Sequence, residues 1–371
     1  MSSGACSSES CPERDLEERI FFPKPNVMRT VTAIALLPLA ALAFSPSSPS
    51  SYHLAHHLHQ QRRTASTRTT SSSSSVRMAA IPEGGKVLCV GTGPVLCLAA
   101  KKAALAGYDT SIIGGEAAES YRQLLSEPGA PEVPNLTILE SITGAASDKF
   151  DELLGSVDAI LLAIDGDAPI GDGLIDLILP AGKTKVQRIV AMSRNLNGKG
   201  MGPFVVSSKM MANQEVWSCN TKDDYVRFEA KLKSAAAAVG ADCVIARAGT
   251  LKGGGPGGED ASCAETARTG LSYAFYNLGQ QDIVNWRLLF DCNVQGVELT
   301  KGDTAEGPGF TAVFAATAAE AKPGDTGRHG VAGAMVHALG HGPGGVDFAV
   351  RTAEGSTPPS KAEWDALFAK L

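Results

Sequence analysis

The sequence predicts an α/β protein with a doubly wound, mostly parallel sheet and a small C-terminal α+β lobe. Three observations predict it. Short apolar runs alternate with helical segments from Lys86 to Ala246, these runs are continuously apolar, and a glycine-rich turn joins the first run to the first helix. Continuous apolar runs are typical of parallel strands covered by helices on both faces. Their alternation with helices indicates right-handed βαβ units.

The strands and helices are expected in strict alternation. The expected strands are Lys86–Val90, Thr110–Ile113, Leu136–Leu139, Ala159–Ile164, Arg188–Met192 and Cys243–Ala246. The expected helices are Pro94–Ala106, Ala117–Leu125, Asp148–Leu154, Ile170–Leu179 and Asp223–Val239. Pro94 fits the first turn of the first helix, because an N–H at that position has no partner within the helix. Gly107 follows the end of the same helix, as is typical of a helix C-terminus.

From about residue 250 the alternation becomes less regular. After a glycine-rich loop, Lys252–Gly258, we expect a helix near Ala264–Tyr276, a strand at Phe310–Ala315, a helix at His329–Leu339, a strand at Val346–Arg351 and a last helix at Lys361–Leu371. Ser360 is expected to cap the last helix. These elements form the predicted lobe, which we expect to close a ligand cleft at the carboxyl ends of the strands.

Residues 1–78 have the composition of a targeting leader. Val31–Phe44 is an apolar run too short to cross a bilayer, with Arg29 before it and Ala41-Leu42-Ala43 at its end. This pattern predicts a signal peptide over about residues 28–43, with Met28 as the true start and residues 1–27 as an extension. The alternative start is Met1.

Residues 44–78 predict a transit peptide, because they are rich in Ser and Arg and contain no Asp or Glu. With Phe44 at the junction, the two parts resemble the bipartite leader of plastid proteins in algae with complex plastids. The resemblance implies a stromal or peripheral thylakoid location. The alternative is a secreted protein with a disordered Ser-rich linker. The mature chain, 79–371, contains no transmembrane span.

Charge and cysteine usage narrow the possible partners. Residues 1–78 hold 8 Lys and Arg against 5 Asp and Glu, and the remainder holds 25 against 34. This acidic remainder argues against a nucleic-acid partner, whose phosphates need Lys and Arg. Its six cysteines show no CxxC motif, so we expect no disulfide framework.

The turn after the first strand, Gly91-Thr92-Gly93-Pro94-Val95-Leu96, predicts a dinucleotide-binding loop. Its glycines permit a tight turn and close approach of a pyrophosphate, which the helix N-terminus attracts. Gly91, Thr92, Gly93, Pro94 and Val95 are therefore the candidate cofactor-binding residues. Leu96 stands where a third glycine is usual, so we expect it to push the helix outward or fill a gap.

The end of the second strand leaves the choice between NAD and NADP open. At this position an acidic residue would bind the ribose 2′-hydroxyl of NAD, and an arginine would bind the 2′-phosphate of NADP. This chain has Gly114 there. We include Gly114 among the cofactor-binding candidates. The alternative interpretation is a Rossmann scaffold whose cofactor pocket no longer works.

Gly240-Ala241-Asp242 and Arg247-Ala248-Gly249 resemble segments of the atypical short-chain dehydrogenase/reductase superfamily, in its NmrA-like branch. Ser193 at a strand end, the helix Gly330–Val336 and Glu363-Trp364 in the last helix resemble it too. The resemblance implies a Rossmann fold, an NAD(P) cofactor and cofactor-binding roles for Ser193 and Arg247. Because the branch includes plastid assembly and import factors, it also implies a plastid protein complex as partner.

The chain departs from the catalytic pattern of that superfamily. Active relatives carry Tyr-x-x-x-Lys on one helix, whereas Tyr225 is followed four residues later by Glu229. A carboxylate there would disfavour the phenolate, and Lys231 lies on another side of the helix. Tyr225 and Ser193 are thus weak catalytic candidates, and we expect Tyr225 not to serve as a general acid.

Two other groups could hold metals, but we predict no metal site. His337 and His341 are four residues apart, without the glutamate of a zinc protease motif. Asp165-Gly166-Asp167 could hold Mg²⁺, and we favour a plain polar loop. Near a bound pyrophosphate this loop would add negative charge, which would weaken the binding of a dinucleotide.

Two functions remain open. The first is an NAD(P)-binding plastid protein with weak or absent hydride transfer, acting as a nucleotide-responsive scaffold or assembly factor. The second is an NAD(P)-dependent oxidoreductase that acts on a small plastid metabolite.

Overall fold

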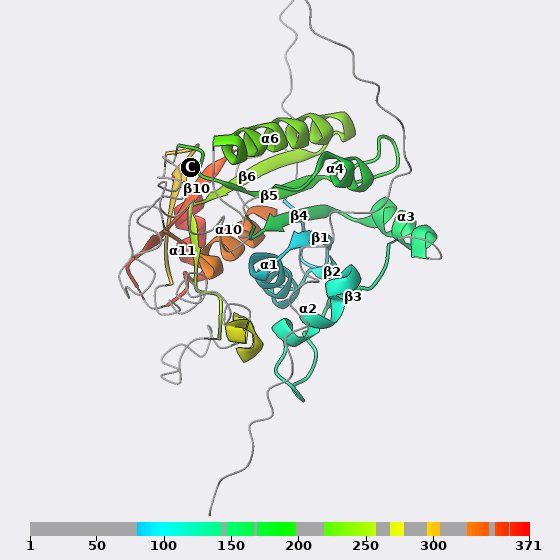
Figure 1. Cartoon of the computed structure of the whole chain (residues 1–371). Helices are drawn as coiled ribbons and strands as arrows, with labels where there is room; N and C mark the ends of the chain where they lie inside the picture. Colours follow the sequence, from blue (N-terminus) through cyan, green and yellow to red (C-terminus); the bar gives the residue numbers. More distant parts are fainter. Residues whose placement is uncertain are drawn as a thin grey trace, which may run out of the picture. The chain divides into compact units, whose positions relative to one another are not determined.

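Eight of the ten described strands form one sheet, shown in Figure 1. The computed structural model describes residues 80–142, 146–166, 169–197, 219–256, 268–277, 295–304, 325–340, 346–355 and 357–371. All of them belong to one compact unit of the chain. The predicted leader, residues 1–78, lies outside the described residues and stays a prediction.

The sheet has the strand order β3-β2-β1-β4-β5-β6-β10-β8. The bounds are β1 Lys86–Thr92, β2 Asp109–Ile113, β3 Leu136–Leu139, β4 Ala159–Ile164, β5 Arg188–Arg194, β6 Asp242–Ala248, β8 Gly296–Lys301 and β10 Phe348–Ala353. Neighbouring strands are parallel except β10 and β8. The order reverses between β1 and β4. This confirms the predicted doubly wound sheet and places the ligand crevice of such folds beside β1 and β4.

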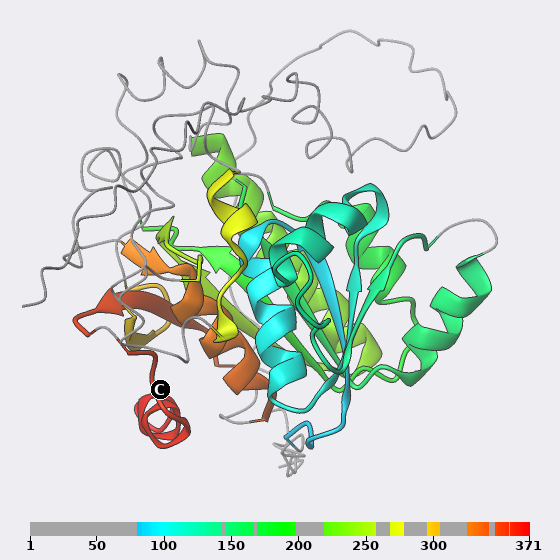
Figure 2. The same cartoon turned by 90° about the horizontal axis from the view of Figure 1, so that it is seen from below.

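Two helical layers cover the two faces of the sheet. One core lies on the face of the sheet that is turned towards the viewer in Figure 2. The helices that contribute to it are α1 (Pro94–Leu105), α2 (Ala118–Leu125), α10 (Arg328–Gly340) and α11 (Lys361–Phe368). Helices α3 (Ser147–Ser156), α4 (Asp172–Ile178) and α6 (Cys219–Val239) contribute to the other. In β4, Leu161 and Ala163 face the first core, and Ile160 and Leu162 face the second. The same alternation decides which face a residue at a strand end lies on.

The ends of the helices follow the signals in the sequence. Helix α1 begins with Pro94, and Gly107, with φ +94°, follows its last turn. The N–H of Tyr108 then donates to Ala103 O at 3.1 Å, which satisfies a carbonyl at the helix end. Helix α11 begins with a capping box formed by Ser360 and Glu363, as expected for the Ser360 cap.

The region after β6 differs from expectation. The helix predicted near Ala264–Tyr276 is confirmed only at Arg268 and Thr269, the first described residues of that range; it ends there, and a separate 3₁₀ helix, η4, covers Tyr273–Asn277. Just before it, Leu271 N–H donates to Gly254 O at 3.1 Å and Ser272 N–H to Leu124 O at 2.8 Å. Because these N–H groups are used in tertiary contacts, they cannot join a helix. The strand predicted at Phe310–Ala315 lies outside the described residues.

The C-terminal residues extend the main sheet. β10 pairs with β6, and β8, which the sequence did not predict, pairs with β10 at the sheet edge. A separate two-stranded sheet joins β7 (Thr250–Lys252) to β9 (Asp325–Gly327). A lobe boundary at about residue 250 stays a prediction. Among the described helices, none has both the length and the apolar character of a membrane span.

Three cysteines lie in or against the two cores of the sheet. Cys89, Cys97 and Cys243 are free thiols. Burial raises the pKa of Cys89 and Cys97 well above the usual range of a thiol, and raises that of Cys243 to about 12. At neutral pH these side chains are small apolar groups.

Candidate functional site

The loop between β1 and α1 has the tight geometry that the sequence predicts. Gly91 has φ +134° and Gly93 has φ +96°, a region that residues with a side chain rarely adopt. A Cβ atom on Gly91 would lie 1.8 Å from the Ala163 carbonyl oxygen of β4, and one on Gly93 would lie 2.8 Å from the Asp165 Cβ. The two glycines thus let β4 and Asp165 lie directly against the loop.

The Asp165 carboxylate occupies the position where a helix N-terminus attracts an anion. Asp165 follows β4 on the side of α1, by the alternation that puts Ala163 there. Its Oδ1 accepts the N–H of Val95, in the first turn of α1, at 2.7 Å. Its backbone N–H donates to Thr92 O at 3.2 Å. An internal carboxylate therefore binds the helix end that a dinucleotide phosphate would use.

Two buried arginines complete this anion site. Arg328, the first residue of α10, donates from Nε to Asp165 Oδ2 at 2.7 Å and from Nη1 to Gly253 O at 3.0 Å. Its guanidinium carbon also lies 6.0 Å from the centre of the Phe275 ring. Arg194, at the end of β5, donates to Gly249 O at 2.9 Å and to the Asp165 carbonyl at 3.4 Å. Arg328 thus contacts the carboxylate of Asp165, and Arg194 contacts its backbone carbonyl.

The two unusual residues of the loop both lie in the first turn of α1. Leu96 is fully buried in the core of the α1 face, so it fills space between helix and sheet. Pro94 stands at the first position of α1. Asp165 is the side chain that binds the helix N-terminus here.

Gly114 has no room for a side chain. A Cβ atom there would lie 2.8 Å from Ala118 Cα and 2.8 Å from Ile138 Cγ2. Close packing of α2 and β3 therefore explains the glycine.

Ser193 and Tyr225 lie on the α6 side of the sheet, away from the Asp165 carboxylate. Ser193 is the residue before Arg194, the last residue of β5, and its buried Oγ has no hydrogen-bond partner among the described residues. Tyr225 is buried in the core beneath α6, and its hydroxyl donates to Gly166 O at 3.2 Å.

Glu229 and Arg247 form a buried ion pair. Arg247 Nε donates to Glu229 Oε1 at 3.0 Å, and its Nη2 donates to Asp347 Oδ2 at 3.1 Å. Lys233 reaches the same Asp347 carboxylate at 2.6 Å. Both Arg247 and Glu229 therefore have partners within the protein. The expected repulsion between Glu229 and a Tyr225 phenolate needs correction, because Arg247 compensates the charge of that carboxylate. Lys231, as expected, points elsewhere, to Asp176 at 2.6 Å.

The sequence did not single out Arg194 or Arg328. Each arginine is far along the chain from the glycine loop, and neither belongs to a motif. Asp165 belongs to a segment whose sequence favours a plain polar loop, although its position two residues after Ala163 indicates the correct side of the sheet.

His337, one of the two histidines with zinc-like spacing, has other contacts. His337 lies 3.2 Å from Asp365 Oδ1 and stacks on Trp364, and His341 lies outside the described residues. In the described ranges no three or more His, Cys, Asp or Glu side chains group in a way that could hold a metal ion.

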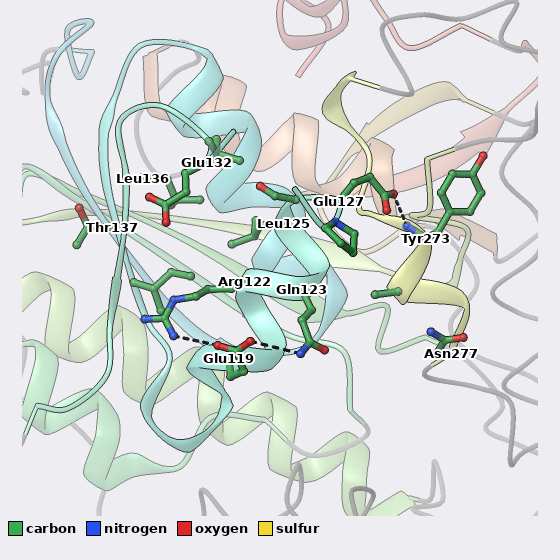
Figure 3. Close-up of a pocket in the computed structure, with 15 residues that line it drawn as sticks. Glu119, Arg122, Gln123, Leu125, Glu127, Glu132, Leu136, Thr137, Tyr273 and Asn277 are labelled. Atoms are coloured by element: carbon green, nitrogen blue, oxygen red, sulfur yellow. Dashed lines mark hydrogen bonds and ion pairs between the residues drawn. The ribbon is translucent and has the colours of Figure 1, made fainter. Parts of the chain in front are cut away.

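A groove of about 930 Å³ lies at the β3 edge of the sheet, between α2, β3 and η4 (Figure 3). Glu127 Oε1 accepts the Tyr273 N–H at 2.7 Å across it, and Arg122 pairs with Glu119 at 3.3 Å. Its lining contains none of the loop residues from Gly91 to Val95. The groove is thus separate from the predicted dinucleotide position.

Buried His329, beside Arg328, makes stability depend on pH. Its Nε2 lies 3.0 Å from Gly255 O, and burial lowers its pKa from 6.5 to about 3. Below pH 6.5 the His329 imidazole becomes protonated in the unfolded chain but stays neutral in the folded chain. The free energy of unfolding therefore falls as pH falls towards 3. We expect His329 to account for a loss of about 2 kcal/mol between pH 7 and pH 5.

Urea unfolding at the two pH values checks this expectation. His329→Gln should reduce the pH-dependent loss by that amount, whereas His337→Gln should leave most of it. An unchanged pH dependence in His329→Gln would contradict the assignment.

The strand order and the loop define a doubly wound α/β protein of the Rossmann type. No family model and no curated protein matches the chain. Among solved structures it is similar to UDP-N-acetylglucosamine 4-epimerase from Methanobrevibacter ruminantium M1, with 12% identity and a TM-score of 0.38 over 73% of this chain and 78% of that one.

Two further solved structures show a similar level of likeness. UDP-N-acetylglucosamine 4-epimerase from Bacillus cereus has 11% identity and a TM-score of 0.37 over 76% of this chain and 82% of that one. The terminal R domain from the myxalamid PKS-NRPS biosynthetic pathway has 12% identity and a TM-score of 0.41 over 79% of each chain.

Proposed function

We propose that the chain is a plastid NAD(P)-binding protein of the atypical short-chain dehydrogenase/reductase type, with weak or absent hydride transfer, that acts as a nucleotide-responsive scaffold or assembly factor. One observation carries the proposal. At the end of β1, the Val95 N–H and the Arg328 guanidinium converge on one anion position in the setting where Rossmann proteins bind a pyrophosphate.

The residues of the loop fit a dinucleotide on one condition. Gly91, Gly93 and the Val95 N–H give the backbone approach that a pyrophosphate needs, and Arg328 supplies a cation. Asp165 uses both the N–H and the guanidinium, so a phosphate must replace its carboxylate. When bound, the nicotinamide ring would supply a hydride acceptor or donor.

The residues near the strand ends support binding rather than reduction. A reductase of this type needs an acid whose proton can reach the substrate. The Tyr225 hydroxyl is buried and donates to Gly166 O, and the residue one turn along α6 is Glu229, which Arg247 binds. Neither group supplies the lysine-assisted phenol of active relatives.

Replacing Tyr225 by Phe should leave any reductase turnover within twofold of the wild type. The change removes the hydrogen bond to Gly166 O and costs about 1 kcal/mol of stability. Steady-state kinetics with the full chain would measure turnover, and urea unfolding would measure the stability. A hundredfold loss of turnover would instead identify Tyr225 as the acid and favour the oxidoreductase alternative.

Cofactor titration tests the proposed function directly. The full chain is titrated with NADPH and NADH while nicotinamide fluorescence is followed, and then mixed with a panel of carbonyl and enone substrates. Saturable binding without cofactor oxidation supports the proposal. Turnover would favour the oxidoreductase, and no binding at millimolar cofactor would exclude both.

The plastid location is proposed from the leader alone. A fluorescent protein fused behind residues 28–78 should enter the complex plastid of a suitable alga, and Phe44→Ala should stop it before the plastid. Secretion of the wild-type fusion would contradict the location and support the alternative of a secreted protein.

A further inference from the structure

We propose that Asp165 and Arg328 form a latch, in which the Asp165 carboxylate occupies the phosphate position of the dinucleotide site and must leave before a dinucleotide binds. This inference rests on the proposed function and adds how the site is controlled. Asp165 would set the affinity, and Arg328 would pass from the carboxylate to the incoming phosphate.

The first argument is that both oxygens of Asp165 hold groups that a phosphate would use. Oδ1 accepts the Val95 N–H and Oδ2 accepts Arg328 Nε, each at 2.7 Å. Charge-assisted bonds of this length are stronger than neutral ones. A phosphate offers the same acceptor oxygens with equal or greater charge, so the exchange keeps every donor paired.

The second argument is how closely Asp165 lies against the loop. The Asp165 Cβ and Oδ1 are both 2.8 Å from the place that a Cβ of Gly93 would occupy. Gly93 is the residue that permits close approach of a ligand to the backbone in such loops. Two groups cannot share this space, so carboxylate and phosphate exclude each other.

The third argument is that the latch is not a helix cap from the local sequence. The capping position of α1 is Gly93, which has no side chain to accept a hydrogen bond. The carboxylate comes instead from the end of β4 and its counter-ion from the start of α10, 163 residues further along. Once released, Asp165 is next to Gly166, which is exposed, so its carboxylate can turn to water.

The latch links the loop to the C-terminal part of the chain. Arg328 also donates to Gly253 O, and β9 immediately before it pairs with β7. A buried ion pair between Lys252 and Asp325, 2.7 Å apart, joins the same two strands. A change in the group that Arg328 binds would therefore alter the contacts of β7, β9 and the start of α10. Nucleotide binding would in this way change the C-terminal part of the chain.

Binding measurements on full-chain variants test the latch. NADPH and NADH are titrated by nicotinamide fluorescence into wild type, Asp165→Ala, Asp165→Asn and Asp165→Ala with Arg328→Ala. We expect Asp165→Ala to lower Kd at least tenfold, Asp165→Asn to lower it too, and the double variant to lose most of this gain. Circular dichroism confirms that each variant is folded.

Asp158→Ala is the matched control. Asp158 lies just before β4, and its carboxylate accepts the Lys86 N–H at 2.8 Å, so the change removes the same charge and the same kind of bond at the opposite end of the strand. Its Kd should equal that of the wild type. An equal gain there would overturn the latch by attributing the effect to net charge.

Hydrogen exchange at Val95 gives a readout that needs no nucleotide. In the free wild type the Val95 N–H is held by Asp165 and should exchange slowly, whereas in Asp165→Ala it should exchange at least tenfold faster. Unchanged exchange, or equal Kd in wild type and Asp165→Ala, would overturn the latch and leave nucleotide binding intact. Absence of binding in every variant would overturn the proposed function itself.

Discussion

Replacing Gly91 by alanine is expected to prevent stable folding of the sheet. The new Cβ would lie 1.8 Å from the Ala163 carbonyl oxygen, in a β4 backbone that is held by pairing on both sides, and Gly91 has φ +134°. Neither the backbone angle nor the neighbour can adjust cheaply. We expect a loss of at least about 4 kcal/mol, measured by urea unfolding or seen as loss of soluble protein.

Gly173→Ala is the matched control for this change. Gly173 lies in α4, and no atom is within 4 Å of a Cβ placed there. Alanine in a helix is favourable by about 0.5–1 kcal/mol relative to glycine, so this variant should be at least as stable as the wild type. If Gly91→Ala matched it, β1 and β4 could not approach each other as the structure has them.

Replacing Arg247 by methionine is expected to destabilise the protein by about 3–5 kcal/mol. The side chains of Arg247 and Glu229 are only 8% and 9% exposed, so the change leaves a buried carboxylate without its cation. Chemical unfolding at pH 7 would measure the loss. Adding Glu229→Leu removes the unpaired charge, and the double variant should recover most of the stability.

The control for Arg247 is an exposed pair on β10 and β8. Arg351 lies 3.9 Å from Glu298, with side chains 35% and 52% exposed, and such pairs contribute about 0–1 kcal/mol. Arg351→Met should therefore change stability by less than 1 kcal/mol. Equal losses in Arg247→Met and Arg351→Met would show that burial of the first pair has no energetic importance.

Most of the sheet could be predicted because its signals are local. The apolar runs of β1 to β6, the proline that begins α1 and the glycine after it are each read within a few residues, and the structure follows them closely. The edge strand β8 has no clear local signal, since Gly296–Lys301 includes charged and polar residues, and among the described strands it pairs with β10 alone.

The candidate site could be predicted only in part. The glycine loop has a motif of its own, but its electrostatic state depends on Asp165 and Arg328, which are brought there by β4 and α10. No spacing rule connects residues 163 positions apart, and the partner of Glu229, Arg247, lies on the next strand. A single sequence shows which groups are present, and the fold decides which charges neutralise each other.

The position of β10 has a consequence for how the sheet is assembled. β6 ends at Ala248, but β10, the described strand that joins β8 to the rest of the sheet and covers the outer side of β6, begins only at Phe348. A chain that emerges from a ribosome with its N-terminus first therefore carries β6 as an uncovered edge until the residues of β10 have emerged as well. Assistance by chaperones during that interval would protect a strand that still lacks its outer partner.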